Sequence, residues 1–117
     1  MKTTAKEFER FKKSFKYWQE KLGLHEYRID FFHKQLKDNY AQIMTSEIGK
    51  TATVCLTTKL DSEDVKCWGG PEVTGKHEAI HLLVRRLTWL ARSRHCSEND
   101  IDEEDEKIVR RLEDVLK

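Results

Sequence analysis

The chain has 117 residues, which is enough for one domain with a hydrophobic core but too few for two. Its 22 Lys and Arg residues nearly balance 21 Asp and Glu residues, so no global field attracts nucleic acid or an anionic membrane. No apolar run reaches the roughly 18 residues of a membrane span and no apolar leader opens the chain, so we expect a cytoplasmic protein without a membrane partner.

The first half of the chain predicts one helix followed by three strands. Apolar residues recur at steps of three and four from Phe8 to Leu22, which predicts a helix over residues 4–22 that ends at Gly23. Strands are expected next over residues 27–36, 40–48 and 51–60. Their short connections favour an antiparallel meander.

The second half predicts a loop and two helices. Residues 61–72 contain Gly-Gly-Pro and are expected to form the loop. A central helix is predicted over 73–92 and should be largely buried, because apolar residues cover most of its circumference. An acidic linker at 97–100 leads to a last helix predicted over 101–116. This order of elements predicts an α+β fold in a single domain over residues 1–117.

The pentapeptide His77-Glu78-Ala79-Ile80-His81 in the central helix has the H-E-x-x-H pattern of zinc-dependent hydrolases. Four residues make just over one helical turn, so the two imidazoles lie on one face and can bind one metal ion. Glu78 lies beside them and can take the proton from a zinc-bound water. The pattern therefore predicts a Zn²⁺ site with His77 and His81 as ligands and Glu78 as general base.

A catalytic zinc site usually has three protein ligands, so a third ligand must come from another part of the chain. The longer pattern H-E-x-x-H-x-x-G-x-x-H is excluded, because Val84 and Leu87 stand where it requires Gly and His. The central helix is predicted to end about 15 Å beyond His81, so His95 can be a ligand only if that helix breaks early.

The last helix offers a carboxylate as the third ligand. Glu104 lies four residues before Ile108 and eight before Leu112, at the start of the stripe that should face the core. Asp105 is its closest competitor on this helix. Either carboxylate could instead complement the positive end of the helix dipole. The third ligand is therefore open among Glu104, Asp105 and His95, and Glu104 is the preferred candidate.

Four segments spread over most of the chain are similar to segments of a known protein family. They are KYWQEKLGL, YRIDF, HEAIHLLVRRL and EEDEKIVRRLEDVL. Together they resemble a family of small HExxH metallopeptidases of phages and prophages, related to the compact single-domain gluzincins called minigluzincins. The resemblance implies a zincin-like fold and a downstream glutamate as third zinc ligand, which maps best onto Glu104. The sequence departs from many gluzincins at Ile108, where they have an Asp that holds a ligand histidine.

The resemblance also implies a function, namely zinc-dependent hydrolysis of a peptide or protein substrate. Such enzymes add an extended peptide to an edge strand, and the strands at 40–48 and 51–60 are the candidates. Cys67 precedes the central helix, and its thiolate could occupy the open zinc position and keep the enzyme latent.

Three other functions compete with this interpretation. A catalytically idle binding module could keep the zincin fold, although it would not need Glu78. An SprT-like DNA-associated protease would use His95 as third ligand and a basic N-terminal helix near DNA, but Cys96 follows His95 where that class usually has glycine. In a metal-free domain the motif would be accidental, and Glu104 or backbone carbonyls would bind the two imidazoles.

Overall fold

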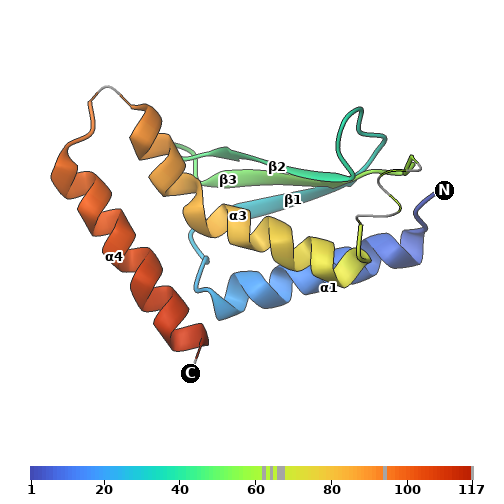
Figure 1. Ribbon diagram of the computed structural model, residues 1–117, viewed down its shortest axis with the longest axis horizontal. Helices are drawn as coiled ribbons and strands as arrows, with labels where there is room; N and C mark the ends of the chain where they lie inside the picture. Colours follow the sequence, from blue (N-terminus) through green and yellow to red (C-terminus); the bar gives the residue numbers. More distant parts are fainter. Residues whose placement is uncertain (62, 64, 66–67, 94, 117) are drawn as a thin grey trace.

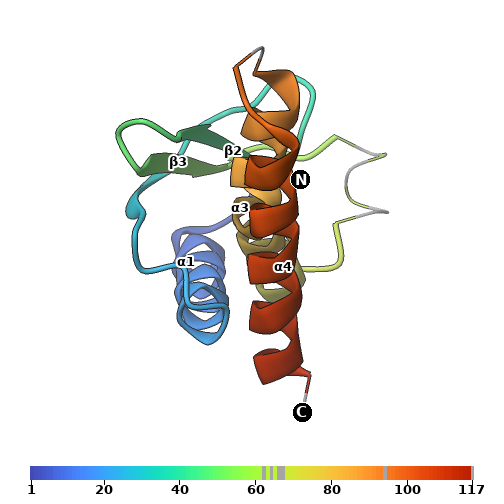
Figure 2. The same cartoon turned by 90° about the vertical axis from the view of Figure 1, so that its left-hand side faces the viewer.

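The computed structural model describes residues 1–61, 63, 65, 68–93 and 95–116 (Figure 1). Its elements follow in the order α1 (Ala5–Lys21), β1 (Arg28–His33), β2 (Ala41–Ser46), β3 (Thr51–Leu56), α3 (Pro71–Arg92) and α4 (Glu98–Val115). The sheet lies over the layer formed by α1 and α3, and α4 packs against α3 (Figures 1 and 2). The predicted α+β order is confirmed.

The strand order is β1-β3-β2, with β3 in the centre. β3 pairs in parallel with β1, in the register Arg28 to Thr51, and antiparallel with β2, in the register Ala41 to Leu56. The sheet is therefore mixed, and the predicted antiparallel meander is wrong. The connection 34–40, at about 3.3 Å per residue, is long enough to cross the roughly 10 Å between two strands separated by a third.

Capping boxes determine where α1 and α4 begin. The Thr4 side chain accepts a hydrogen bond from the Glu7 backbone N–H, and the Glu7 carboxylate accepts one from the Thr4 N–H. Ser97 and Asp100 form the same reciprocal pair, so α4 begins within the segment predicted as a linker. α3 also begins earlier than predicted, at Pro71, since proline needs no N–H partner in the first helical turn.

Gly75 allows α1 and α3 to cross at close range. A Cβ atom at Gly75 would lie 2.7 Å from the Phe11 carbonyl oxygen and 2.8 Å from Ser14 Cβ. The Ser14 hydroxyl donates to the Glu72 carbonyl at 2.6 Å, and Phe11 and Phe15 are fully buried. α1 therefore positions the part of α3 that immediately precedes the H-E-x-x-H motif.

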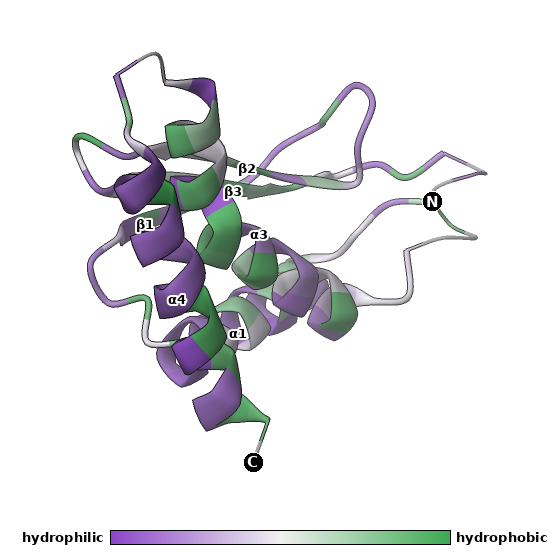
Figure 3. Cartoon of the chain, turned by 60° about the vertical axis from the view of Figure 1, so that its left-hand side comes forward, coloured by the Kyte–Doolittle hydropathy of each residue, from purple (hydrophilic) through white to green (hydrophobic). Residues whose placement is uncertain are grey.

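The hydrophobic core lies between the sheet and the helices. Its fully or nearly fully buried apolar side chains include Phe11, Phe15, Leu24, Ala52, Val54, Leu56, Ala79, Leu82 and Leu83. α4 contributes Ile108 to this core and turns a hydrophilic face outward (Figure 3). Among the described helices, none is long and apolar enough to cross a membrane.

Candidate functional site

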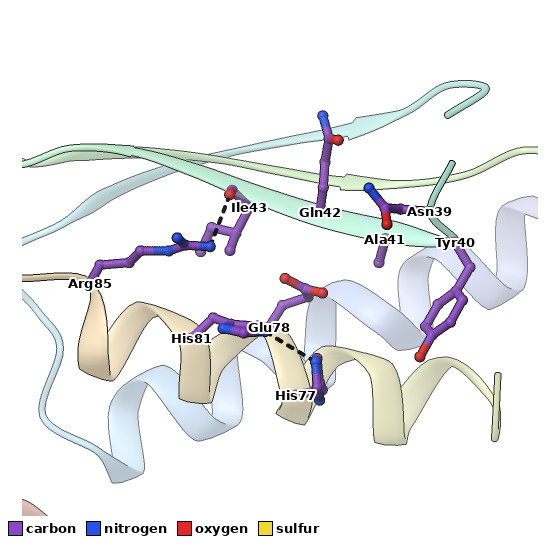
Figure 4. Close-up of a pocket in the computed structure, with 9 residues that line it drawn as sticks. All are labelled: Asn39, Tyr40, Ala41, Gln42, Ile43, His77, Glu78, His81 and Arg85. Carbon is purple, nitrogen blue, oxygen red and sulfur yellow. Dashed lines mark hydrogen bonds between the residues drawn. The ribbon is translucent and has the colours of Figure 1, made fainter. Parts of the chain in front are cut away.

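A pocket of about 380 Å³ lies between α3 and the beginning of β2 (Figure 4). It is lined by His77, Glu78, His81 and Arg85 from α3 and by Asn39, Tyr40, Ala41, Gln42 and Ile43 from β2 and the loop before it. The structure thus brings the two histidines and the glutamate of the motif together in one pocket.

The two motif imidazoles converge. The Nε2 atoms of His77 and His81 lie 3.1 Å apart, and the ring planes are inclined by 81°. Two nitrogens bound tetrahedrally to one zinc ion would be about 3.3 Å apart, given Zn–N distances near 2.05 Å. The pair therefore fits two neighbouring ligand positions around a single zinc ion.

The surroundings of His81 favour its metal-binding form. Burial lowers the pKa of His81, and the neighbouring His77 and Arg85 lower this pKa further. A lowered pKa keeps the imidazole neutral at neutral pH, and a metal ion binds only the neutral form.

Glu78 is a buried carboxyl group, with only 4% of the residue exposed. No residue in the described part of the chain forms a hydrogen bond or ion pair with it. Burial raises the pKa of Glu78 to about 7, although the positive charge of Arg85 opposes this rise. A carboxyl group with a pKa near neutrality can both accept and release a proton at neutral pH.

Glu104 is buried, but it is not part of this pocket. Its carboxylate lies 3.2 Å from Arg86 Nε and 3.5 Å from Lys107 Nζ, in a second pocket. Arg86 follows His77 by nine residues, which is half a rotation around the helix at about 100° per residue. Glu104 therefore meets the side of α3 opposite to His77 and does not line the pocket of the two histidines. The apolar stripe on α4 predicts that Glu104 points inward. It does not predict which face of α3 Glu104 meets.

The other predicted ligands are also absent from the pocket. Asp105 is exposed on α4, and His95 is exposed in the turn before it. Cys67 lies outside the described residues. Within residues 1–61, 63, 65, 68–93 and 95–116, no three His, Cys, Asp or Glu side chains are grouped closely enough to hold a metal ion. The described pocket thus offers two imidazole ligands, with Glu78 beside them.

Arg85 and Tyr40 line the pocket but are not among the predicted site residues. Arg85 follows His81 by four residues, so the helical spacing that joins the two histidines also places Arg85 on the motif face. That signal is present in the sequence. Tyr40 reaches the pocket only because β2 is the strand beside α3, and no local pattern predicts this sheet order.

β2 is an edge strand whose free side faces the pocket. The Thr57 N–H donates to the Tyr40 carbonyl at 2.8 Å, so residues 40, 42 and 44 direct their backbone groups to β3. The backbone groups of Ala41 and Ile43 point to the opposite side, and both residues line the pocket. β3, the other predicted edge strand, is central and cannot pair with a further strand.

Comparisons of the chain with models of protein families, with curated proteins and with solved structures find no match. The observations that indicate a function therefore lie in the pocket itself. Its three distinguishing features are the converging imidazoles, the buried carboxyl group beside them and the edge strand opposite.

Proposed function

We propose that the protein is a zinc-dependent metallopeptidase of the small, zincin-like kind suggested by the sequence resemblance. The observation that carries this proposal is the 3.1 Å separation of the His77 and His81 Nε2 atoms beside the buried Glu78 carboxyl group. Two neutral imidazoles and a neighbouring carboxylate are the groups that metal-assisted hydrolysis requires. The free thiols Cys55 and Cys96 suit a reducing compartment, so we place the activity in the cytoplasm.

The residues of the pocket have separate tasks in this proposal. His77 and His81 would hold a zinc ion, which when bound makes water more acidic and polarises a carbonyl group. Glu78 accepts the proton of the attacking water and later gives it to the leaving amine.

The proposed substrate is an extended peptide or protein segment that pairs with the free side of β2. The outward N–H and C=O groups of Ala41 and the outward N–H group of Ile43 can form the hydrogen bonds of an added strand, while the Ile43 carbonyl accepts from Arg85. This pairing would hold the substrate backbone along the pocket, across from His77 and His81 (Figure 4).

A peptide-binding module without catalysis is the second candidate. It is favoured by one observation, namely that the described residues supply two metal ligands and no third. The SprT-like alternative requires His95 as a ligand, yet His95 does not line the pocket. The peptidase and the binding module share the metal and the edge strand and differ in the use of Glu78.

Zinc content and peptide cleavage test the proposal together. Purified wild type should hold one zinc ion per chain, which His77→Ala and His81→Ala should lose and Glu78→Gln should keep. His95→Ala is the matched control and should retain zinc, because His95 is exposed outside the pocket. Wild type should cleave an unstructured protein such as casein, whereas Glu78→Gln should not.

Two results would contradict the proposal. Zinc that survives loss of His81 but disappears with His95 would place the metal elsewhere. Equal cleavage by wild type and Glu78→Gln would exclude Glu78 as the base. Zinc binding without any cleavage would favour the binding module.

A further inference from the structure

Arg85 closes one end of the pocket. It lies one helical turn beyond His81, and its side chain extends from α3 toward β2 (Figure 4). Arg85 Nη2 donates to the Ile43 carbonyl at 3.4 Å, while its buried Nε has no hydrogen-bond partner.

The pairing of Arg85 differs from that of most other described arginines. Arg10, Arg28, Arg86, Arg110 and Arg111 each form an ion pair with a carboxylate. Arg85 has no carboxylate partner within the described residues, although it is partly buried. Glu78 lines the same pocket but forms no ion pair with Arg85 in the described part of the chain.

An unpaired guanidinium in a partly buried position is unfavourable, because donors removed from water lose hydrogen bonds. The guanidinium has five N–H donors in a planar fork, and this fork matches the two oxygens of a carboxylate. Arg85 can therefore keep its bond to Ile43 and still bind an incoming anion.

We infer that Arg85 determines specificity by binding a carboxylate group of the substrate. This inference rests on the proposed function, since the position of the substrate is defined by the cleaved bond. Arg85 lies about 6 Å along α3 from His81, and an extended peptide advances about 3.3 Å per residue. The carboxylate therefore belongs to the first or second residue beside the cleaved bond.

The direction of the peptide determines the source of this carboxylate. β2 and α3 both run from the Tyr40 and His77 end of the pocket to the Ile43 and Arg85 end (Figure 4). A peptide antiparallel to β2 places its residues N-terminal to the cleaved bond at Arg85, where the carboxylate is an Asp or Glu side chain. Antiparallel pairing is the more stable arrangement. A parallel peptide would instead present its C-terminal carboxylate there.

Matched peptides test the inference. One panel consists of ten-residue peptides, acetylated and amidated at the ends, which differ by Glu or Gln at a single position. A second panel carries a free or an amidated C-terminus. Cleavage is measured by mass spectrometry for wild type, Arg85→Gln and Arg85→Lys. Arg92→Gln is the control, since Arg92 is exposed in the last turn of the same helix.

We expect wild type to prefer the Glu peptide over its Gln partner by about tenfold or more when Glu lies N-terminal to the cleaved bond. Arg85→Gln should abolish this preference, Arg85→Lys should retain part of it, and Arg92→Gln should leave it unchanged. An Arg85-dependent preference for peptides with a free C-terminus would also support a carboxylate site at Arg85. The bound carboxylate would then be the C-terminus of a peptide parallel to β2. An unchanged preference in Arg85→Gln would overturn the inference, as would no preference in wild type.

Binding to the cleavage-incompetent Glu78→Gln protein separates this inference from the proposed function. Titration calorimetry with the same peptide pairs measures recognition without hydrolysis. If wild type cleaves nothing but Glu peptides bind tighter in an Arg85-dependent manner, the carboxylate site stands and the peptidase proposal fails. If cleavage occurs without any Arg85-dependent preference, the peptidase proposal stands and the carboxylate site fails. If wild type cleaves nothing and no pair differs in affinity, both fail.

Discussion

The Glu104 carboxylate lies 3.2 Å from the Arg86 guanidinium and holds α4 against the side of α3 that faces away from His77. Its side chain is 4% exposed, so its charge depends on Arg86 and on Lys107 for compensation. Glu104 is thus a structural carboxylate in this arrangement.

We predict that Glu104→Gln lowers the free energy of unfolding by about 1–3 kcal/mol and leaves the zinc content unchanged. The loss is smaller than for a fully buried pair because Arg86 is partly exposed. Urea denaturation and metal analysis measure the two quantities. Glu106→Gln is the control, since its ion pair with Arg110 is exposed and should contribute at most about 0.5 kcal/mol. Loss of zinc from Glu104→Gln alone would restore Glu104 as a ligand.

The raised pKa of Glu78 predicts a pH-dependent stability in the metal-free protein. This pKa is about 7 in the folded protein, against an ordinary value of 4.5. The folded state therefore binds the Glu78 proton more tightly, and this stabilisation is complete below pH 4.5 and is lost as pH rises to 7. The loss is of the order of 3 kcal/mol.

Glu78→Gln should remove this dependence. With EDTA present, its stability advantage over wild type should grow between pH 5 and pH 8, as measured by urea denaturation at both values. Glu103→Gln, at an exposed position on α4, should show no such growth. An advantage that is the same at pH 5 and pH 8 would mean that the Glu78 pKa is not raised.

Gly75→Ala should separate α1 from α3. The new methyl group would overlap the Phe11 carbonyl oxygen and Ser14 Cβ, at 2.7 and 2.8 Å. We expect a loss of about 1–3 kcal/mol in unfolding free energy, although alanine is the better helix former by about 1 kcal/mol. Val73→Ala, on the exposed side of the same turn, should change stability by about 0.5 kcal/mol or less. A stabilised Gly75→Ala protein would exclude the close crossing.

Tyr27→Phe should destabilise the turn that joins β2 to β3. The Tyr27 hydroxyl donates to the buried Glu47 carboxylate, and burial together with Glu47 raises the pKa of Tyr27. Without this hydroxyl, Lys50, at 3.2 Å, is the only partner left to Glu47 among the residues that the structure describes. We expect a loss of about 1–3 kcal/mol by thermal or urea denaturation. Tyr17→Phe, at an exposed tyrosine, should have no measurable effect.

Local patterns predict the elements of this fold well. The aromatic stripe from Phe8 onward and the alternation around Val54 depend on near neighbours, and the corresponding helix and strand are present. The sheet order is a different matter, because β1 and β3 pair across an intervening strand. A short connection restricts how far the chain travels, but it does not determine which strands become neighbours.

In the candidate site, too, local spacing predicts some features and the tertiary fold determines the others. His77 and His81 converge because one helix carries both, so their spacing is sufficient to predict it. Glu104 is buried as its stripe predicts, yet its partner depends on how α4 crosses α3. Along the sequence, β2 and β3 lie between Tyr40 and the H-E-x-x-H motif. Tyr40 reaches the pocket of the motif only through the tertiary fold.

The hairpin of β2 and β3 can close from local contacts, since only the turn at 47–50 separates the two strands. β1 pairs with β3 through a larger loop, but all three strands still precede His77 along the chain. During synthesis on the ribosome, which runs from the N-terminus, the strand that borders the pocket is therefore complete before either histidine has been added. The metal uptake that we propose would therefore follow the emergence and docking of α3.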